Sequence, residues 1–198
     1  MYCKGLNLIY IPIRKTGCTS IRESLSRYCD DSEFPERFSL GCAGWDWELV
    51  KELMNNPYVL ASVRNPFSRM VSNYTYTEFG KDIWGSPVDF ETFVEKSLDG
   101  FLEEPWSEHI YMTCSDYLYT KSGRLVADKI LRQETLDEDW VKFAEQKELN
   151  PHLEVRNKSH KEHDHYSRYY TYKAIEMVGK HFRRDLNNFG YTFEDLTR

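Results

Sequence analysis

Short apolar segments along the chain are each followed directly by polar residues. The first runs from Leu6 to Ile13 and the second from Tyr58 to Val63. An apolar run of this length, bounded by polar or turn-forming residues, is typical of a buried strand, and it is too short to span a bilayer. Lys129 to Leu131 fits a further, shorter strand. We therefore predict strands at these three places.

Elsewhere the apolar residues recur at the spacing of helices. Residues 19–28 follow this pattern, and Thr19 or Ser20 can cap the first turn. Residues 167–186 carry a longer stripe that stops before Gly190, a residue suited to the left-handed conformation that ends many helices. Further helices are predicted over residues 45–54, 67–79, 88–96, 108–118 and 138–147.

The alternation of strands and helices predicts the fold class. It favours an α/β fold with a central, mostly parallel sheet flanked by helices in three layers, joined by right-handed crossovers. The 198 residues are enough to bury a core, and they show no repeat, low-complexity tract or linker. We predict a single domain over residues 1–198.

The net charge disfavours two classes of partner. The chain has 26 basic and 32 acidic residues and a net charge of −6. Proteins whose main task is to bind nucleic acid or an anionic membrane are usually basic. We expect no nucleic-acid partner and no membrane insertion, while a local basic pocket for a small anion stays open.

The five cysteines are scattered along the chain without a C-x-x-C pair. Their odd number and loose spacing argue against a disulfide framework and against a structural zinc site. We predict reduced cysteines in a cytoplasmic protein.

The first candidate site is the segment between the first predicted strand and helix, Arg14-Lys15-Thr16-Gly17-Cys18-Thr19-Ser20. Such a loop can surround a phosphate with backbone N–H groups and a helix N-terminus, while a lysine adds charge and hydroxyls add donors. An ordinary capped strand-to-helix turn is the alternative. The lysine precedes the glycine, so the segment is not a full P-loop, which disfavours ATP or GTP hydrolysis.

The second candidate site follows the second predicted strand. Arg64 comes directly after Val63, and Ser72 is eight residues further along a predicted helix. Ligands of open α/β sheets bind at the carboxyl ends of strands, where an arginine can fork onto a phosphate and a serine can donate its hydroxyl. The alternative is a structural salt bridge for Arg64 and an ordinary helical position for Ser72.

The two candidate sites contain the motifs K-T-G-C-T-S and V-R-N-P-F-S-R-M-V-S-N-Y. Taken together, these motifs resemble the two nucleotide-binding signatures of sulfotransferases that use 3′-phosphoadenosine 5′-phosphosulfate (PAPS). The likeness is greatest to the carbohydrate branch, which includes the heparan 2-O, chondroitin and HNK-1 type enzymes and bacterial relatives. It continues through residues 130–136, 152–160 and 185–193, and so covers nearly the whole chain. The resemblance implies a P-loop-NTPase-like fold.

The resemblance also implies an activity and a role for each motif. The chain would be a sulfotransferase of the EC 2.8.2 type that moves a sulfuryl group from PAPS to an acceptor hydroxyl of a glycan or another small molecule, releasing PAP without a metal. Lys15 would stabilise charge on the leaving nucleotide, and Arg64 and Ser72 would hold the 3′-phosphate. Lys158 and Ser159 would close over the nucleotide. The residues implied to hold the 5′-phosphosulfate are Arg14, Lys15, Thr16, Gly17, Cys18, Thr19 and Ser20.

The catalytic base is less clearly marked than the donor site. Many relatives carry a histidine after a glycine between the two motifs, but this chain has no histidine before His109. His109 is our first candidate, and Asp46 or Glu48 is the second. For the acceptor site, Trp84 and Trp106 are candidates because they fall in segments predicted to be irregular.

Three further interpretations remain. The late histidines, His160, His163 and His165, match no standard zinc spacing, so we predict no metal. A degenerate P-loop kinase or NTPase would need a strand-end acidic residue for Mg²⁺, and none is evident. A catalytically inactive nucleotide-binding module is the other alternative, suggested by the missing histidine.

Overall fold

The computed structural model describes residues 1–29, 47–99, 108–153 and 165–194, and the chain forms two compact units. The sheet unit comprises Met1–Val63 and Cys114–His160, and the helical unit comprises Arg64–Thr113 and Lys161–Arg198. The prediction of one domain over residues 1–198 stays a prediction.

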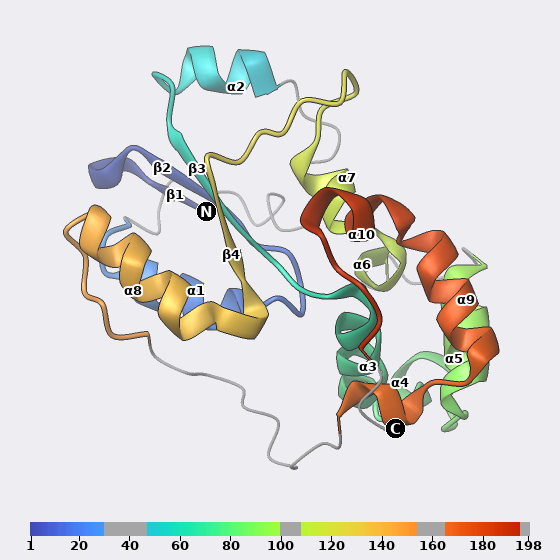
Figure 1. Cartoon of the computed structure of the whole chain (residues 1–198). Coiled ribbons are helices and arrows are strands. Elements are labelled where there is room, and N and C mark those ends of the chain that lie inside the picture. The colour runs from blue at the N-terminus through green and yellow to red at the C-terminus, as the bar shows by residue number, and fades with distance from the viewer. Residues whose placement is uncertain (30–46, 100–107, 154–164, 195–198) are drawn as a thin grey trace. The chain divides into compact units, whose positions relative to one another are not determined.

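A four-stranded sheet forms the centre of the sheet unit (Figure 1). Its strands are β1 (Tyr2–Cys3), β2 (Leu8–Ile11), β3 (Tyr58–Val63) and β4 (Lys129–Arg132), which lie side by side in that order. β2, β3 and β4 are parallel, and only the edge strand β1 runs antiparallel to its neighbour. The predicted mostly parallel α/β fold is therefore confirmed, and its parallel strands end at a common edge.

One face of this sheet packs against α1 (Cys18–Ser26) and α8 (Leu136–Gln146). The alternation of side chains along each strand directs Leu8, Tyr10 and Leu60 into this core. The helices contribute large apolar residues, including Trp140 and Phe143. The start of α1 is thereby fixed close to the carboxyl ends of the parallel strands.

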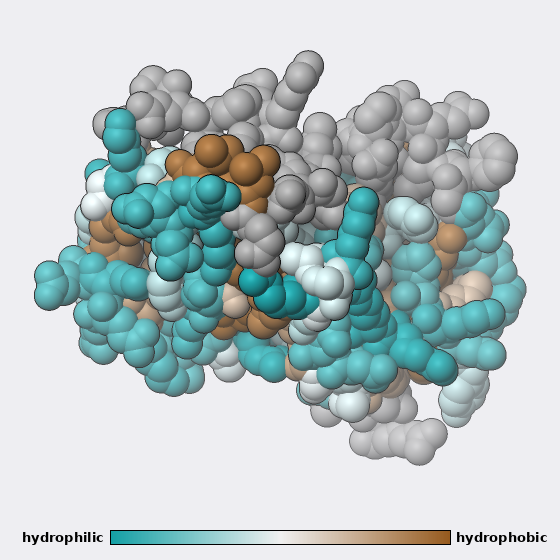
Figure 2. Space-filling view, turned by 90° about the horizontal axis from the view of Figure 1, so that it is seen from above, coloured by the Kyte–Doolittle hydropathy of each residue, from teal (hydrophilic) through white to brown (hydrophobic). Residues whose placement is uncertain are grey.

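Two more helices belong to the sheet unit, α2 (Trp47–Leu53) and α7 (Cys114–Leu118). Trp47 is buried in α2, but Leu49 and Leu53 remain 48% and 75% exposed. Figure 2, a view from above, shows an apolar patch on the surface of α2. The apolar stripe in this segment predicts the helix correctly, although its leucines do not enter a core.

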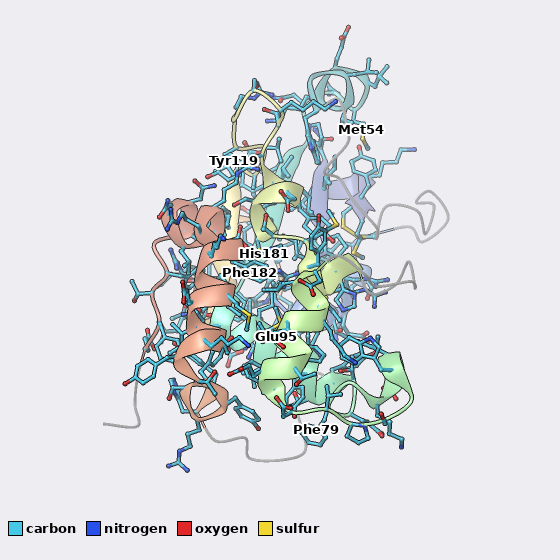
Figure 3. The ribbon with its side chains drawn as sticks, turned by 90° about the vertical axis from the view of Figure 1, so that its right-hand side faces the viewer. Met54, Phe79, Glu95, Tyr119, His181 and Phe182 are labelled. Atoms are coloured by element: carbon cyan, nitrogen blue, oxygen red, sulfur yellow. A yellow bond between two sulfur atoms is a disulfide. The ribbon has the colours of Figure 1, made fainter. Side chains whose placement is uncertain are left out.

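The helical unit is built from short helices around an aromatic core. Tyr74 packs edge-on against three phenylalanine rings with centroid distances of 5.1 to 5.2 Å. α5 (Phe90–Leu98) and α9 (Tyr172–His181) lie next to each other (Figure 3). Glu95 on α5 is paired to Lys173 on α9. The helices of this unit in the described residues are α3 (Pro66–Tyr76), α4 (Lys81–Trp84), α5 (Phe90–Leu98), α6 (Glu108–Tyr111), α9 (Tyr172–His181) and α10 (Arg183–Phe189).

The prediction of one continuous helix over residues 167–186 is wrong. Tyr166–Tyr169 form a 3₁₀ helix, and Thr171 then caps α9 by accepting a hydrogen bond from the Ala174 N–H. A second break at Phe182 separates α9 from α10. Gly190 ends α10 in the left-handed conformation, as predicted.

The prediction of reduced cysteines is wrong for Cys3 and Cys29, which form a disulfide bond. The bond joins β1 to the segment just after α1, two places that are distant in sequence but adjacent in the core. Cys18 is half-buried and Cys114 buried, and both are thiols. The cytoplasmic location, which we inferred from reduced cysteines, stays a prediction. Within the described residues, none of the helices has the length and apolar content needed to cross a membrane.

Removing the disulfide should destabilise the sheet unit. The two cysteines are separated by 26 positions in the sequence, and for a loop of this length the loss of unfolded-state entropy predicts about 3.5 kcal/mol of stabilisation. Cys3→Ala/Cys29→Ala should lower the free energy of unfolding in urea by that amount, and wild-type protein in reductant should match it. Equal unfolding of the wild type with and without reductant would contradict this assignment.

Candidate anion-binding site

The loop between β2 and α1 has an unusual backbone conformation. Lys15 and Gly17 both lie in the left-handed region, with φ of 68° and 83°. This conformation is strained for lysine and free of strain for glycine. The loop therefore turns sharply on both sides of Thr16 before the helix begins.

Gly17 occupies the N-cap position of α1 and contributes no side-chain hydrogen bond there. A Cβ atom at this position would lie 2.5 Å from Cδ2 of Leu136, the first residue of α8. The backbone conformation therefore favours glycine, and any larger residue would also have to displace the end of the Leu136 side chain. Because no side chain from the N-cap residue covers the first turn, the start of α1 can receive an anion.

Thr16 is directed into the protein instead of toward a ligand. Its side chain is fully buried, and its hydroxyl donates a hydrogen bond to the Ile13 carbonyl at 2.8 Å. The same oxygen lies 2.7 Å from Oγ of Ser62 on β3. A contribution of Thr16 to anion binding would therefore come from its backbone. Nothing in the sequence pattern indicates Ser62 as its partner.

The thiol of Cys18 lies at the start of α1, near the cationic side chains of the loop. Burial raises the pKa of this thiol above its usual range, although Arg22, Lys15 and Arg14 each oppose that effect. The thiol is therefore protonated at neutral pH and is not an activated nucleophile. This favours a loop that binds and polarises its ligand without a covalent intermediate.

The second motif folds into the start of α3. Asn65 caps the helix by accepting a hydrogen bond from the Phe67 N–H at 3.0 Å, and Pro66 occupies the first helical position. Arg64 donates from Nε to Ser68 Oγ at 2.9 Å. Ser72 follows Ser68 by one helical turn, so both serines lie on the same face of α3. Ser68 was not among the predicted site residues.

The sheet relates the two motifs through their strands. β2 and β3 are neighbours in parallel register, with Ile11 paired to Ala61. The hydrogen bond between Thr16 and Ser62 joins the first loop to β3 one residue before that strand ends. Arg64 follows Val63 directly in the chain. The predicted strand context of both motifs is therefore correct.

His109, the first candidate for the base, lies on α6 in the helical unit and is 5% exposed. The buried side chain of Arg69 donates to the His109 carbonyl at 2.6 Å and to the Met112 carbonyl at 2.8 Å. This guanidinium therefore fixes the backbone of the segment that carries His109.

Several other predicted residues lie outside the described residues, namely Asp46, Trp106, Lys158, Ser159, His160 and His163, together with the side chain of Glu48. Trp84 is part of α4 and packs against Phe93, so the prediction of an irregular segment is wrong there. His165 accepts a hydrogen bond from the Ser167 N–H as the cap of a 3₁₀ helix. No group of three or more His, Cys, Asp or Glu side chains suited to a metal occurs in the part of the chain that the structure describes.

Comparison with known proteins gives one finding on the family. The model described as "Sulfotransferase family" matches residues 1–192 of this chain. No curated protein and no solved structure matches it. The family match spans both units and includes both motifs.

The two constraints on Gly17 can be separated by experiment. Gly17→Ala should lower the free energy of unfolding in urea by about 2–3 kcal/mol, because left-handed strain and crowding against Leu136 add. Gly123→Ala is the matched control, since Gly123 has φ of 81° and no neighbouring atom within 4 Å of the added Cβ. That variant should lose about 1 kcal/mol, from strain alone. Equal losses in the two variants would show that contact with Leu136 has no part in the requirement for glycine.

Proposed function

The chain belongs to the sulfotransferase family, and we propose that it transfers the sulfuryl group of PAPS to a hydroxyl group of a carbohydrate acceptor. Sulfuryl transfer is the general reaction of the family, whereas the donor and the acceptor class are our inferences. The observation that carries the proposal is the loop before α1, where Lys15 and an N-cap glycine stand beside an α-helical N-terminus.

The features of this loop fit the 5′ end of PAPS. The helix N-terminus and the backbone N–H groups from Thr16 onward offer donors to a doubly charged phosphosulfate. Arg14 and Lys15 add positive charge, and Thr19 and Ser20 follow in the first turn of α1. Cys18 stays a neutral thiol and so adds no negative charge.

Lys15 is proposed as the catalytic residue. Sulfuryl transfer resembles phosphoryl transfer, in which positioning and charge stabilisation supply most of the catalysis. Negative charge grows on the bridging oxygen of the leaving nucleotide, and an ammonium group placed there acts mainly in the transition state. The half-buried Lys15 meets this need with less screening than an exposed lysine would.

The 3′-phosphate would be held by Arg64 together with Ser72, with Ser68 as a further contributor. Arg64 is already oriented by its hydrogen bond to Ser68, which lies on the same face of α3 as Ser72. A guanidinium can bind two phosphate oxygens at once, and hydroxyls add directional donors. This group would select a nucleotide with a 3′-phosphate over ATP. Lys158 and Ser159 are proposed to cover the nucleotide.

A base must remove the proton of the acceptor hydroxyl, because a sugar hydroxyl is a poor nucleophile near neutral pH. His109 remains our first proposal, with Asp46 and Glu48 as the alternatives. Arg69 supports His109 in this role because it holds the backbone of α6 from within a buried environment. Both side chains arise from the helical unit.

The donor specificity is tested by ligand-dependent melting. PAP at 100 times its dissociation constant should stabilise the protein by about 2.7 kcal/mol and raise Tm by about 5–10 °C. ATP with Mg²⁺ at the same concentration should raise Tm far less, because it lacks a 3′-phosphate. A larger shift with ATP and Mg²⁺ than with PAP would favour a kinase or NTPase and contradict the proposal.

Two variants then separate the roles of the motifs. Lys15→Ala should abolish sulfation across a glycan panel, read by mass shift, while PAP affinity stays within about tenfold. Arg64→Ala should weaken PAP binding by about 2–4 kcal/mol, roughly 30- to 1,000-fold. Lys121→Ala, at an exposed lysine of the sheet unit, is the control and should change neither property. If both site variants lower affinity equally and Lys15→Ala retains sulfation, this division of roles is wrong.

A further inference from the structure

Three buried hydroxyl groups connect β2, β3 and the loop before α1. The Tyr10 hydroxyl lies 2.9 Å from Ser62 Oγ, which lies 2.7 Å from Thr16 Oγ1. Thr16 donates in turn to the Ile13 carbonyl at 2.8 Å. All three side chains are fully buried. The loop is thus linked to the interior of the sheet by a chain of hydrogen bonds.

The number of protons fixes the direction of this chain. A carbonyl oxygen only accepts, so the single hydroxyl proton of Thr16 points to Ile13. In the pair of Thr16 and Ser62, the donor must then be Ser62. Since the Ser62 proton is used in this way, Tyr10 is the donor to Ser62. The donation therefore runs from Tyr10 through Ser62 and Thr16 to the Ile13 carbonyl.

The first donor of the chain keeps its proton over the working pH range. Burial raises the pKa of Tyr10 well above its usual value, and the negative form of Cys18 would raise it further. The hydrogen bond with Ser62 opposes these effects without overcoming them. Hydrogen bonds that all point the same way also polarise one another in a buried environment.

The last hydroxyl of this hydrogen-bond chain belongs to Thr16, which lies between two residues in the left-handed conformation. Lys15 and Gly17 flank Thr16, and a non-glycine residue persists in the left-handed region only where its surroundings hold it. The two side-chain hydrogen bonds of Thr16 restrain the backbone of the loop in this conformation. Ser62 is also the only hydroxyl in the otherwise apolar part of β3 after Tyr58, where a small apolar residue would suffice for packing.

We propose that Ser62 and Tyr10 are positioning residues for the site that binds the sulfuryl donor PAPS. Through Thr16 they hold Lys15 and the start of α1 in the geometry that receives the 5′-phosphate. This inference rests on the proposed PAPS-dependent function and adds two residues to it. Neither residue contacts the ligand itself, since both hydroxyls are buried and bonded within the chain.

The test compares two nucleotides that differ in the 5′-phosphate. Titration calorimetry with PAP and with adenosine 3′-monophosphate measures the affinity with and without that group. Ser62→Ala leaves the Tyr10 hydroxyl without its acceptor and Thr16 without its donor. It should raise the Kd for PAP about tenfold, while the Kd for the 3′-monophosphate changes less than about twofold.

Two further variants complete the experiment. Tyr10→Phe leaves Ser62 and Thr16 bonded to each other, so it should raise the Kd for PAP only about two- to threefold, again without affecting the 3′-monophosphate. This variant also carries the test if Ser62→Ala does not fold. The matched control is Ser24→Ala on α1, whose hydroxyl has no hydrogen-bond partner among the described residues. It should leave both affinities unchanged.

Two results would overturn the positioning role. One is a folded Ser62→Ala or Tyr10→Phe variant that binds PAP as the wild type does. The other is an equal loss of affinity for both nucleotides, which indicates a general effect on the fold. A failure of the proposed function is visible earlier, because wild-type protein would then bind PAP no more tightly than the 3′-monophosphate, and the positioning role would fall with it.

Discussion

The parallel pairing of β2 with β3 is the constraint on which the candidate site depends. It places the carboxyl ends of two strands at the same edge of the sheet, and each strand leads into one of the two motifs. The hydrogen bond between Thr16 and Ser62 strengthens this arrangement, because it ties the loop after β2 directly to β3. A shift of register between these strands would separate the two hydroxyls and release the loop.

The chemistry of the site follows from this constraint. The loop has left-handed turns at Lys15 and Gly17, and Gly17 also leaves the start of α1 without an N-cap side chain. An anion at this position would take the place of the missing cap and would lie beside a half-buried cation. Such a site favours reactions in which a charged group is held and polarised, and sulfuryl transfer is one of them.

Much of this arrangement could be predicted from the sequence. β3 was predicted with its observed limits because its apolar residues are local and end abruptly at Arg64. The loop before α1 could be identified because glycine, lysine and hydroxyl residues occur together just after a strand. The disulfide between Cys3 and Cys29 was missed, since the two residues become neighbours only when β1 packs beside the end of α1. Ser62 was missed for the same reason, because its partner is 46 residues away in the chain.

The errors in the helical unit have a local cause. The apolar stripe of residues 167–186 has helical spacing throughout, and periodicity alone does not reveal the cap at Thr171 or the break at Phe182. α4 was missed because it spans only four residues between Gly80 and Gly85. Short helices bounded by caps are decided by a few hydrogen bonds, which a hydrophobic pattern does not record.

The most direct measurement of the central claim is a crystal structure with bound PAP. In that structure, oxygens of the 5′-phosphate should accept hydrogen bonds from the Lys15 ammonium and from backbone N–H groups at the start of α1. The guanidinium of Arg64 should bind the 3′-phosphate of the same nucleotide. A nucleotide bound away from the loop, or one whose 3′-phosphate does not contact Arg64, would contradict the proposed site.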